Sequence, residues 1–312
     1  MNLAIPPAVL ALTLGILAAC RSEPEFPAQA GAVDDALKQD LALLRDHRIY
    51  FGHQSVGQNI LEGLSELVKE AGETRFAIAD LDKGQSLTAG GIAHAHIGRN
   101  LDPRSKCDAF SKTLGTAAPN VPHVQYDMAA LKFCYLDVDS KTDVASLFAY
   151  YKTALESAQA MNPSMVIVYV TVPLKTGMRG RLAGIKRLLG LHNRNDTRND
   201  ADNLRRAEFN GMLRQAFAGK PGFARFDLAA VESTYPDGSR ESFQKDGKTG
   251  YRLLNSLSSD GGHLNDLGKR VAAKAFLHAL AAAAGGPMPT ASARSSFRSE
   301  SIPRQGTGNS SR

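Results

Sequence analysis

Three residues near opposite ends of the chain are of the types that carry out nucleophilic catalysis. Ser55 lies in the stretch YFGHQSVGQNI, where a strand-like run at residues 49–51 breaks at Gly52 and apolar residues of helical spacing follow. Asp260 and His263 lie three residues apart in SSDGGHLND. An aspartate that orients an imidazole, which takes a proton from a serine hydroxyl, makes this weak nucleophile competent.

Each part of this set also has a purely structural explanation. Residues 55–58, SVGQ, form a capping box, in which a serine closes the start of a helix. A serine at such a corner equally lies near backbone N–H groups at the positive end of a helix dipole, where an oxyanion is stabilised. The D-x-x-H spacing is common by chance, with Asp260 capping a turn and His263 opening a helix.

Helical and strand patterns alternate along the chain and predict the elements that position these residues. Helices are expected at residues 34–47, 56–71, 143–161, 203–218 and 265–284, strands at 48–52, 76–81, 129–135, 165–172 and 224–228, and a Gly-, His- and Asn-rich loop at 83–105. This alternation favours one α/β domain over residues 33–284, with a mostly parallel five-stranded sheet covered on both faces. Functional sites in such sheets lie beyond the carboxyl ends of the strands, where the corner at residues 52–55 is found.

With this order of elements, the chain resembles the SGNH, or GDSL, hydrolase superfamily over nearly all of residues 45–284. The resemblance implies a three-layer α/β/α, flavodoxin-like fold, with the nucleophilic serine after the first strand and a D-x-x-H pair before the last helix. It implies that Ser55 is the nucleophile, His263 the general base and Asp260 its orienting partner. In AHIGRN it implies that the Gly98 N–H helps to form the oxyanion hole and that Asn100 is a side-chain donor.

The chain departs from the family pattern at two places. The usual GDSL is replaced by GHQS, so that Gln54 stands where an aspartate normally precedes the serine, which is similar to the G-Q-S of carbohydrate acetylesterases. Gln54 and His53 are therefore candidate substrate-binding residues, and a local hydrogen bond is the alternative for His53. The third-block G-x-N-D is not visible, since the chain after the third predicted strand continues as KFCYLDV.

The resemblance implies an ester hydrolase without a cofactor, acting on O-acyl, in particular O-acetyl, groups of a carbohydrate in the cell envelope. The same residues would serve a glycan O-acetyltransferase. A non-catalytic envelope lipoprotein that binds a glycan or protein partner is the contrasting hypothesis. His94 and His96 form an H-x-H pair that suits zinc, but no third ligand lies at a recognisable spacing, so we predict no metal site.

The N-terminal segment predicts export and a lipid anchor. Residues 1–19 are uncharged and largely apolar, and LAAC at residues 17–20 resembles a bacterial lipobox that makes Cys20 the lipidated first residue of the mature protein. An ordinary secretory peptide and a membrane span are the alternatives, although Pro6 and Pro7 leave less than the roughly 20 continuous apolar residues that a span needs. We expect a linker at 20–32, a membrane contact through Cys20 and a place in the cell envelope.

The chain has two cysteines besides Cys20. Cys107 and Cys134 are compatible with a disulfide and with two buried thiols.

The positive charge of the chain is concentrated in two segments. Residues 175–206 carry a net charge of +6, and a tail at 285–312, which we expect to be disordered, carries a net charge of +3. Since the whole chain has a net charge of +6, the remaining residues carry −3.

No nucleic-acid motif accompanies this charge, so we predict no nucleic-acid partner. The segment GMRGRLAGIKRLLGL at residues 177–191 has the pattern of an amphipathic helix. Such a helix suits a lid over the site or a surface that meets anionic lipid or a polyanionic glycan. A solvated helical excursion that packs on the domain is the structural alternative.

Overall fold

The structure is a computed structural model that describes residues 25–27, 29–115, 125–177 and 194–285. The expected signal peptide, Cys20, almost all of the C-terminal tail and residues 178–193 of the basic segment lie outside the described residues. None of the described helices combines the length and the apolar composition that crossing a membrane requires.

Six parallel strands form the central sheet, in the order β2-β3-β1-β4-β5-β6. The strands are β1 (Arg48–His53), β2 (Ala77–Asp80), β3 (Gly91–His96), β4 (Met128–Leu131), β5 (Val166–Val170) and β6 (Phe223–Phe226). Without the edge strand β2, the order β3-β1-β4-β5-β6 is the 2-1-3-4-5 order of flavodoxin-like sheets. The α/β class and the parallel sheet are confirmed, and the predicted count of five strands is corrected to six.

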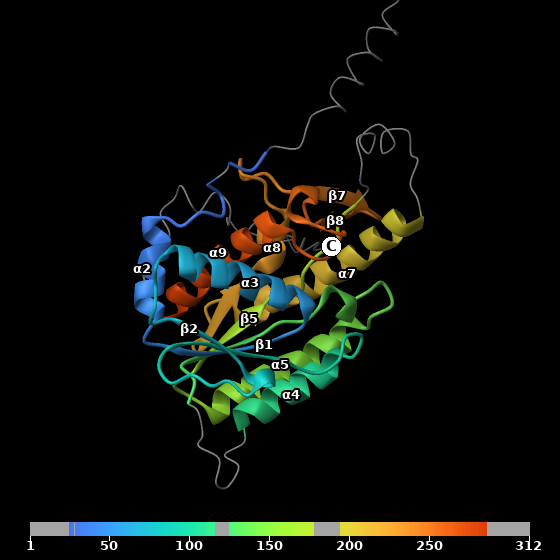
Figure 1. Cartoon of the computed structure of the whole chain (residues 1–312). Coiled ribbons are helices and arrows are strands. Elements are labelled where there is room, and N and C mark those ends of the chain that lie inside the picture. The colour runs from blue at the N-terminus through green and yellow to red at the C-terminus, as the bar shows by residue number, and fades with distance from the viewer. Residues whose placement is uncertain (1–24, 28, 116–124, 178–193, 286–312) are drawn as a thin grey trace, which may run out of the picture.

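Helices cover both faces of the sheet and make it the middle of three layers (Figure 1). One face packs against α2 (Asp35–Leu44), α3 (Ser55–Glu70), α8 (Leu228–Ser233) and α9 (Asp266–Ala283), and the other against α4 (Pro103–Gly115), α5 (Val144–Met161) and α7 (Arg194–Phe217). Strand β1 serves both cores, because Ile49 and Phe51 point to the first face and Tyr50 to the second. Burial on both faces explains why the central strands are continuous apolar runs.

Several elements differ from the sequence prediction. Strand β3 and the start of α4 lie inside the segment 83–105 that we expected to be a loop, and α7 begins at Arg194 rather than at residue 203. An antiparallel hairpin of β7 (Ser242–Lys245) and β8 (Lys248–Tyr251) was not predicted. Strand β4 ends at Leu131, because the Asp137 carboxylate accepts the Cys134 N–H at 2.6 Å and bends the following residues into the 3-10 turn η2 (Tyr135–Asp137).

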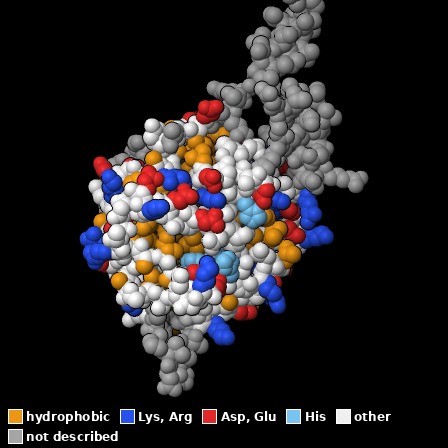
Figure 2. All heavy atoms as spheres, in the orientation of Figure 1, with side chains coloured by type: hydrophobic (Ala, Val, Ile, Leu, Met, Phe, Trp, Pro, Cys, Tyr) orange, Lys and Arg blue, Asp and Glu red, His pale blue; other side chains and the backbone are white. Residues whose placement is uncertain are grey.

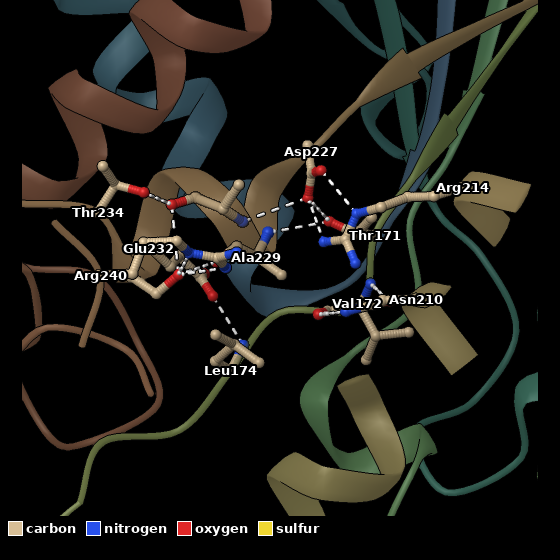
Figure 3. Close-up of polar contacts among 12 residues, drawn as sticks. Thr171, Val172, Leu174, Asn210, Arg214, Asp227, Ala229, Glu232, Thr234 and Arg240 are labelled. Atoms are coloured by element: carbon tan, nitrogen blue, oxygen red, sulfur yellow. Dashed lines mark hydrogen bonds and ion pairs between the residues drawn. The ribbon is translucent and has the colours of Figure 1, made fainter. Parts of the chain in front are cut away.

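A polar network fixes the chain where β5 and β6 end (Figure 3). The Asp227 carboxylate accepts two hydrogen bonds from the Arg214 guanidinium, at 2.8 and 2.7 Å, and one from the Thr171 hydroxyl at 3.1 Å. Thr171 in turn accepts the Ala229 N–H at the start of α8. These bonds hold α7, α8 and the segment that follows β5 together.

Charges on the described surface are interspersed rather than separated by sign, as the face in Figure 2 shows. Part of the basic segment 175–206 is balanced locally. Asp202 lies 3.8 Å from the Arg206 guanidinium, and Asp200 accepts two hydrogen bonds from Arg252. The described residues of this segment, 175–177 and 194–206, carry five Lys or Arg against three Asp, a net of +2 rather than +6.

Candidate active site

Ser55 occupies the corner between β1 and α3. The N-cap of α3 is Gln54, in extended conformation, and Ser55 is the first residue of the helix. Its hydroxyl oxygen lies 3.1 Å from Nε2 of His263. The capping-box interpretation of Ser55 is therefore wrong, because the serine lies one residue past the cap and its side chain faces the histidine.

Asp260 orients the His263 imidazole. Its Oδ2 lies 2.6 Å from Nδ1 of His263, and its Oδ1 accepts the N–H groups of Gly262 at 2.9 Å and His263 at 2.8 Å. An ionised carboxylate only accepts hydrogen bonds, so these partners assign the ring proton to Nδ1 and leave the Nε2 lone pair facing Ser55. Asp260 thus closes a tight turn with one oxygen and selects the imidazole tautomer with the other.

The Asp260 carboxylate keeps its charge at this position. Partial burial acts to raise its pKa, but the hydrogen bonds from the His263 N–H, the His263 ring and the Gly262 N–H more than offset that effect and hold the pKa well below its usual range. The side chain is 57% exposed, so solvent also reaches it. A permanent negative charge beside Nδ1 stabilises the imidazolium that forms when Nε2 takes a proton.

Close helix packing and one amide bring Ser55 and His263 together. Helix α3 begins at Ser55 and α9 follows shortly after His263. At Gly63 the two helices approach so closely that a Cβ would lie 2.4 Å from the Lys269 carbonyl oxygen. One turn after Ser55, the Asn59 side-chain oxygen accepts the Leu264 N–H at 3.2 Å.

The Tyr135 ring lies against the His263 imidazole. Its ring centroid lies 5.7 Å from that of His263, with the planes at 73°. A Cβ at Gly262 would lie 2.7 Å from the Tyr135 ring, so the glycine allows this close approach. Burial raises the pKa of Tyr135 to about 12 and keeps the phenol neutral. No motif identifies Tyr135, and the only signal in the sequence is its position just after a central strand.

The predicted oxyanion residues lie on the loop after β3, which Gln54 fastens to the serine corner. The Gln54 amide nitrogen donates to the carbonyls of Ile97 at 3.0 Å and Gly98 at 3.1 Å. Gly98 has a φ of +59°, and a Cβ there would lie 2.6 Å from the Lys106 backbone nitrogen, so glycine is required. The Asn100 side-chain oxygen accepts a hydrogen bond from the Lys106 ammonium at 2.9 Å, which leaves the Asn100 amide nitrogen as a donor.

A buried ion pair joins α4, the helix that follows this loop, to the turn after β4. The Lys106 ammonium contacts the Asp137 carboxylate, and both side chains are fully buried. Asp137 also accepts the Leu101 N–H at 3.0 Å. Leu101 has a φ of +68° and is 73% exposed, an unusual combination for a leucine. No motif in the sequence marks the ion pair or Leu101.

His53 lies beneath the corner rather than in the open site. Its side chain is fully buried, with Nδ1 3.1 Å from the Gln54 carbonyl oxygen and Nε2 3.1 Å from Nδ1 of His94. Burial lowers the pKa of His53 to about 3, and the bond to Gln54 opposes this shift only in part. The structure favours the local hydrogen bond over substrate contact for His53. The Gln54 amide nitrogen is likewise engaged in hydrogen bonds, which join the serine corner to the loop after β3.

The two histidines of the H-x-H pair take separate partners. His94 contacts His53, and Nδ1 of His96 lies 2.9 Å from the Asp82 carboxylate. Within the part of the chain that the structure describes, no group of three or more His, Cys, Asp or Glu side chains is arranged to hold a metal ion.

Comparisons with known proteins find only remote likenesses. No family model and no curated protein matches the sequence. Among solved structures, a protein described as a candidate platelet activating factor from Streptococcus pneumonia is 12% identical, with a TM-score of 0.42 over 88% of this chain and 100% of that one. A peptidoglycan O-acetylesterase is 14% identical, with a TM-score of 0.38 over 63% of this chain and 48% of that one. The functional conclusion therefore depends on the geometry of the site.

Proposed function

We propose that the protein is an SGNH-type serine hydrolase that cleaves esters. The observation that carries this proposal is the continuous set of contacts from the Ser55 hydroxyl through both ring nitrogens of His263 to Asp260, at 3.1 and 2.6 Å. A serine that only caps a helix needs no contact with a histidine, and an aspartate that only closes a turn needs no contact with an imidazole ring. Nucleophilic catalysis needs the serine, the histidine and the aspartate in contact as one set.

Acyl transfer follows from this arrangement. His263 Nε2 takes the Ser55 proton as the serine oxygen attacks the ester carbonyl, while Asp260 stabilises the imidazolium. Gly57 and Gln58 donate their N–H groups to the Gln54 carbonyl. The Ser55 N–H, which precedes them at the start of α3, is available to the oxyanion together with the Gly98 N–H and the Asn100 amide. His263 then protonates the leaving alcohol, and water repeats the sequence on the acyl-serine.

The substrate class that we propose is an O-acylated, in particular O-acetylated, carbohydrate of the cell envelope. The G-Q-S sequence that is similar to carbohydrate acetylesterases supports it. The lipid anchor expected at Cys20 would hold the protein among envelope glycans. Transfer of the acyl group to a glycan hydroxyl in place of water would use the same residues, and product analysis with an added acceptor sugar separates the two reactions.

Labelling by a fluorophosphonate probe, with p-nitrophenyl acetate turnover alongside, tests the activated serine. We expect both signals in the wild type and in Ser65→Ala, which removes an exposed hydroxyl from the same helix, and neither signal in Ser55→Ala or His263→Ala. A folded wild type that neither labels nor turns over the ester would refute the hydrolase and favour the glycan-binding alternative.

We also propose that the mature protein is a lipoprotein of the cell envelope. The support is the LAAC sequence that ends at Cys20. Membrane fractionation and mass spectrometry of the N-terminal peptide test this assignment. We expect a lipidated Cys20 in the membrane fraction, and loss of both lipid and membrane association in Cys20→Ala. An unmodified wild-type cysteine would contradict it.

A further inference from the structure

Lys175 places a positive charge beside the catalytic residues. Its ammonium nitrogen lies 5.6 Å from the centroid of the Tyr135 ring, and the same ring contacts His263. The next residue, Thr176, donates its N–H to the Gly261 carbonyl at 3.0 Å, within the turn that carries Asp260 and His263. The segment that carries Lys175 is therefore hydrogen-bonded to the turn that carries Asp260 and His263.

The backbone at Lys175 is held in place from both sides. The Asn203 side chain accepts the Lys175 N–H at 3.1 Å and donates to the Lys175 carbonyl at 2.8 Å. The preceding Leu174 N–H donates to the Glu232 carboxylate at 2.7 Å (Figure 3). These bonds fix the point from which the lysine side chain extends, so little further ordering is needed when it binds a ligand.

Within the described residues, no carboxylate lies within 4 Å of the Lys175 ammonium to neutralise it. Arg206 and Arg198 add positive charge nearby, and Asp202, the carboxylate that faces them, pairs with both. Burial, followed by the charge of Arg206, lowers the pKa of Lys175, and the charges of Asp202 and Asp260 oppose this shift only in part. A half-buried cation that no carboxylate contacts directly costs free energy, and an anionic ligand at the ammonium would reduce that cost.

We propose that Lys175 forms an anion subsite, and that the preferred substrate carries a carboxylate or phosphate group on the carbohydrate next to the scissile acyl ester. This inference rests on the proposed hydrolase function. The subsite selects for charge on the carbohydrate, whereas the acyl group meets Ser55 and the oxyanion donors. The proposal also distinguishes Lys175 from the basic residues of segment 175–206 that form ion pairs within the fold, because Lys175 would bind the substrate.

Matched esters test the subsite. The full-length protein would be given O-acetylated methyl glucoside, O-acetylated methyl glucuronoside and O-acetylated glucose 6-phosphate. We expect kcat/KM to be about tenfold to a hundredfold higher for an anionic ester than for the neutral one, with the difference shrinking as salt is added. The better of the two anionic esters identifies a carboxylate or a phosphate as the recognised group.

Substitutions connect this preference to Lys175. Lys175→Met, which keeps the length of the side chain, should reduce the ratio of anionic to neutral kcat/KM to near one, whereas Lys175→Arg should retain part of it. Lys248→Met, at an exposed position on the β7–β8 hairpin, should leave the ratio unchanged. A wild-type ratio near one, or a ratio that survives in Lys175→Met, would overturn the subsite and leave the hydrolase proposal intact.

Failure of the hydrolase proposal is distinguishable from failure of the subsite. If no ester is hydrolysed, calorimetric titration with methyl glucuronoside and glucose 6-phosphate replaces kinetics. Binding that disappears in Lys175→Met but not in Lys248→Met supports the subsite alone. Equal binding in the three proteins, or no binding, rejects it.

Discussion

At the scale of single residues, the two carboxylate oxygens of Asp260 divide its work: Oδ1 holds the turn, and Oδ2 has the proposed catalytic role of orienting His263. We expect Asp260→Asn to keep the turn, because the amide oxygen still accepts the N–H groups of Gly262 and His263. Its NH₂ group would then face Nδ1 of His263 as a donor and move the ring proton to Nε2, which can no longer accept from Ser55. Ester turnover should fall by about 10⁴-fold, with little change in the melting temperature.

Asp260→Ala is the matched control for this prediction, because it removes the turn contacts as well as the orienting group. It should lower both turnover and the melting temperature. Turnover in Asp260→Asn close to that of the wild type would show that Asp260 does not control the tautomer of His263.

Glu232 makes the free energy of unfolding depend on pH. Its side chain is 1% exposed, and burial raises its pKa to about 8 from 4.5. Because the pKa of Glu232 is higher in the folded protein than in the unfolded one, the folded protein holds the Glu232 proton more tightly. The stability that this proton contributes is fully present below the unfolded pKa of 4.5 and is lost as pH rises through about 8. Urea unfolding at pH 5, 6.5 and 8 should show the wild type losing stability relative to Glu232→Gln, by up to about 1.4 kcal/mol per pH unit.

The exposed Glu66→Gln is the control for Glu232, and its difference from the wild type should not change in this way with pH. A constant difference between the wild type and Glu232→Gln across the three pH values would show that Glu232 is ionised in the folded protein.

Short motifs identified Ser55, Asp260 and His263, whereas pairs of distant residues that belong to no motif were missed. Asp260 and His263 are three residues apart, so a motif reveals them. The buried contact between His53 and His94 spans 41 residues, and that between Lys106 and Asp137 spans 31. Nothing in a single sequence indicates such pairs, and for this reason the sequence leaves both substrate contact and a local hydrogen bond open for His53.

At the scale of elements, the packing of α3 against α9 sets the distance between Ser55 and His263. A Cβ at Gly63 would lie 2.4 Å from the Lys269 carbonyl oxygen and 2.9 Å from the Arg270 nitrogen. Gly63→Ala should therefore force the helices apart, lower the free energy of unfolding by about 1–3 kcal/mol and reduce turnover. Chemical denaturation and ester kinetics on the same samples measure both effects.

Gly211→Ala in α7 is the control, because nothing lies within 4 Å of a Cβ at that position. Alanine is the better helix former, so this variant should gain up to about 1 kcal/mol and keep its turnover. Unchanged kinetics in a destabilised Gly63→Ala would separate helix packing from the geometry of the site.

Periodicity predicted most of the helices and the apolar strands, but missed β3, α4 and the β7–β8 hairpin. Strand β3 contains His94 and His96, and the rings of both histidines lie against His53 of the neighbouring strand. Its residues therefore lack the apolar run that identified β5. The order of the strands was also beyond the sequence, since parallel strands are paired through crossovers that leave no local pattern.

At the scale of the whole molecule, the sheet divides the interior into two cores, and this division decides the state of the cysteines. Cys107, on α4, belongs to the core on one side of the sheet, and Cys134, which follows β4, belongs to the core on the other side. The structure has both as buried free thiols. Of the two possibilities left open by the sequence, the free thiols are therefore the ones found.

Thiol titration tests this arrangement in the Cys20→Ser protein, where only two cysteines remain. Burial raises the pKa of Cys107 to about 12, so its reactive thiolate is scarce, and Cys134 is fully buried. We expect Ellman's reagent to detect no thiol in the native protein and two after unfolding in guanidinium chloride without reductant, even when the protein is purified from an oxidising compartment. Absence of thiols in the unfolded protein would mean that the cysteines are bridged, which two separate cores do not allow.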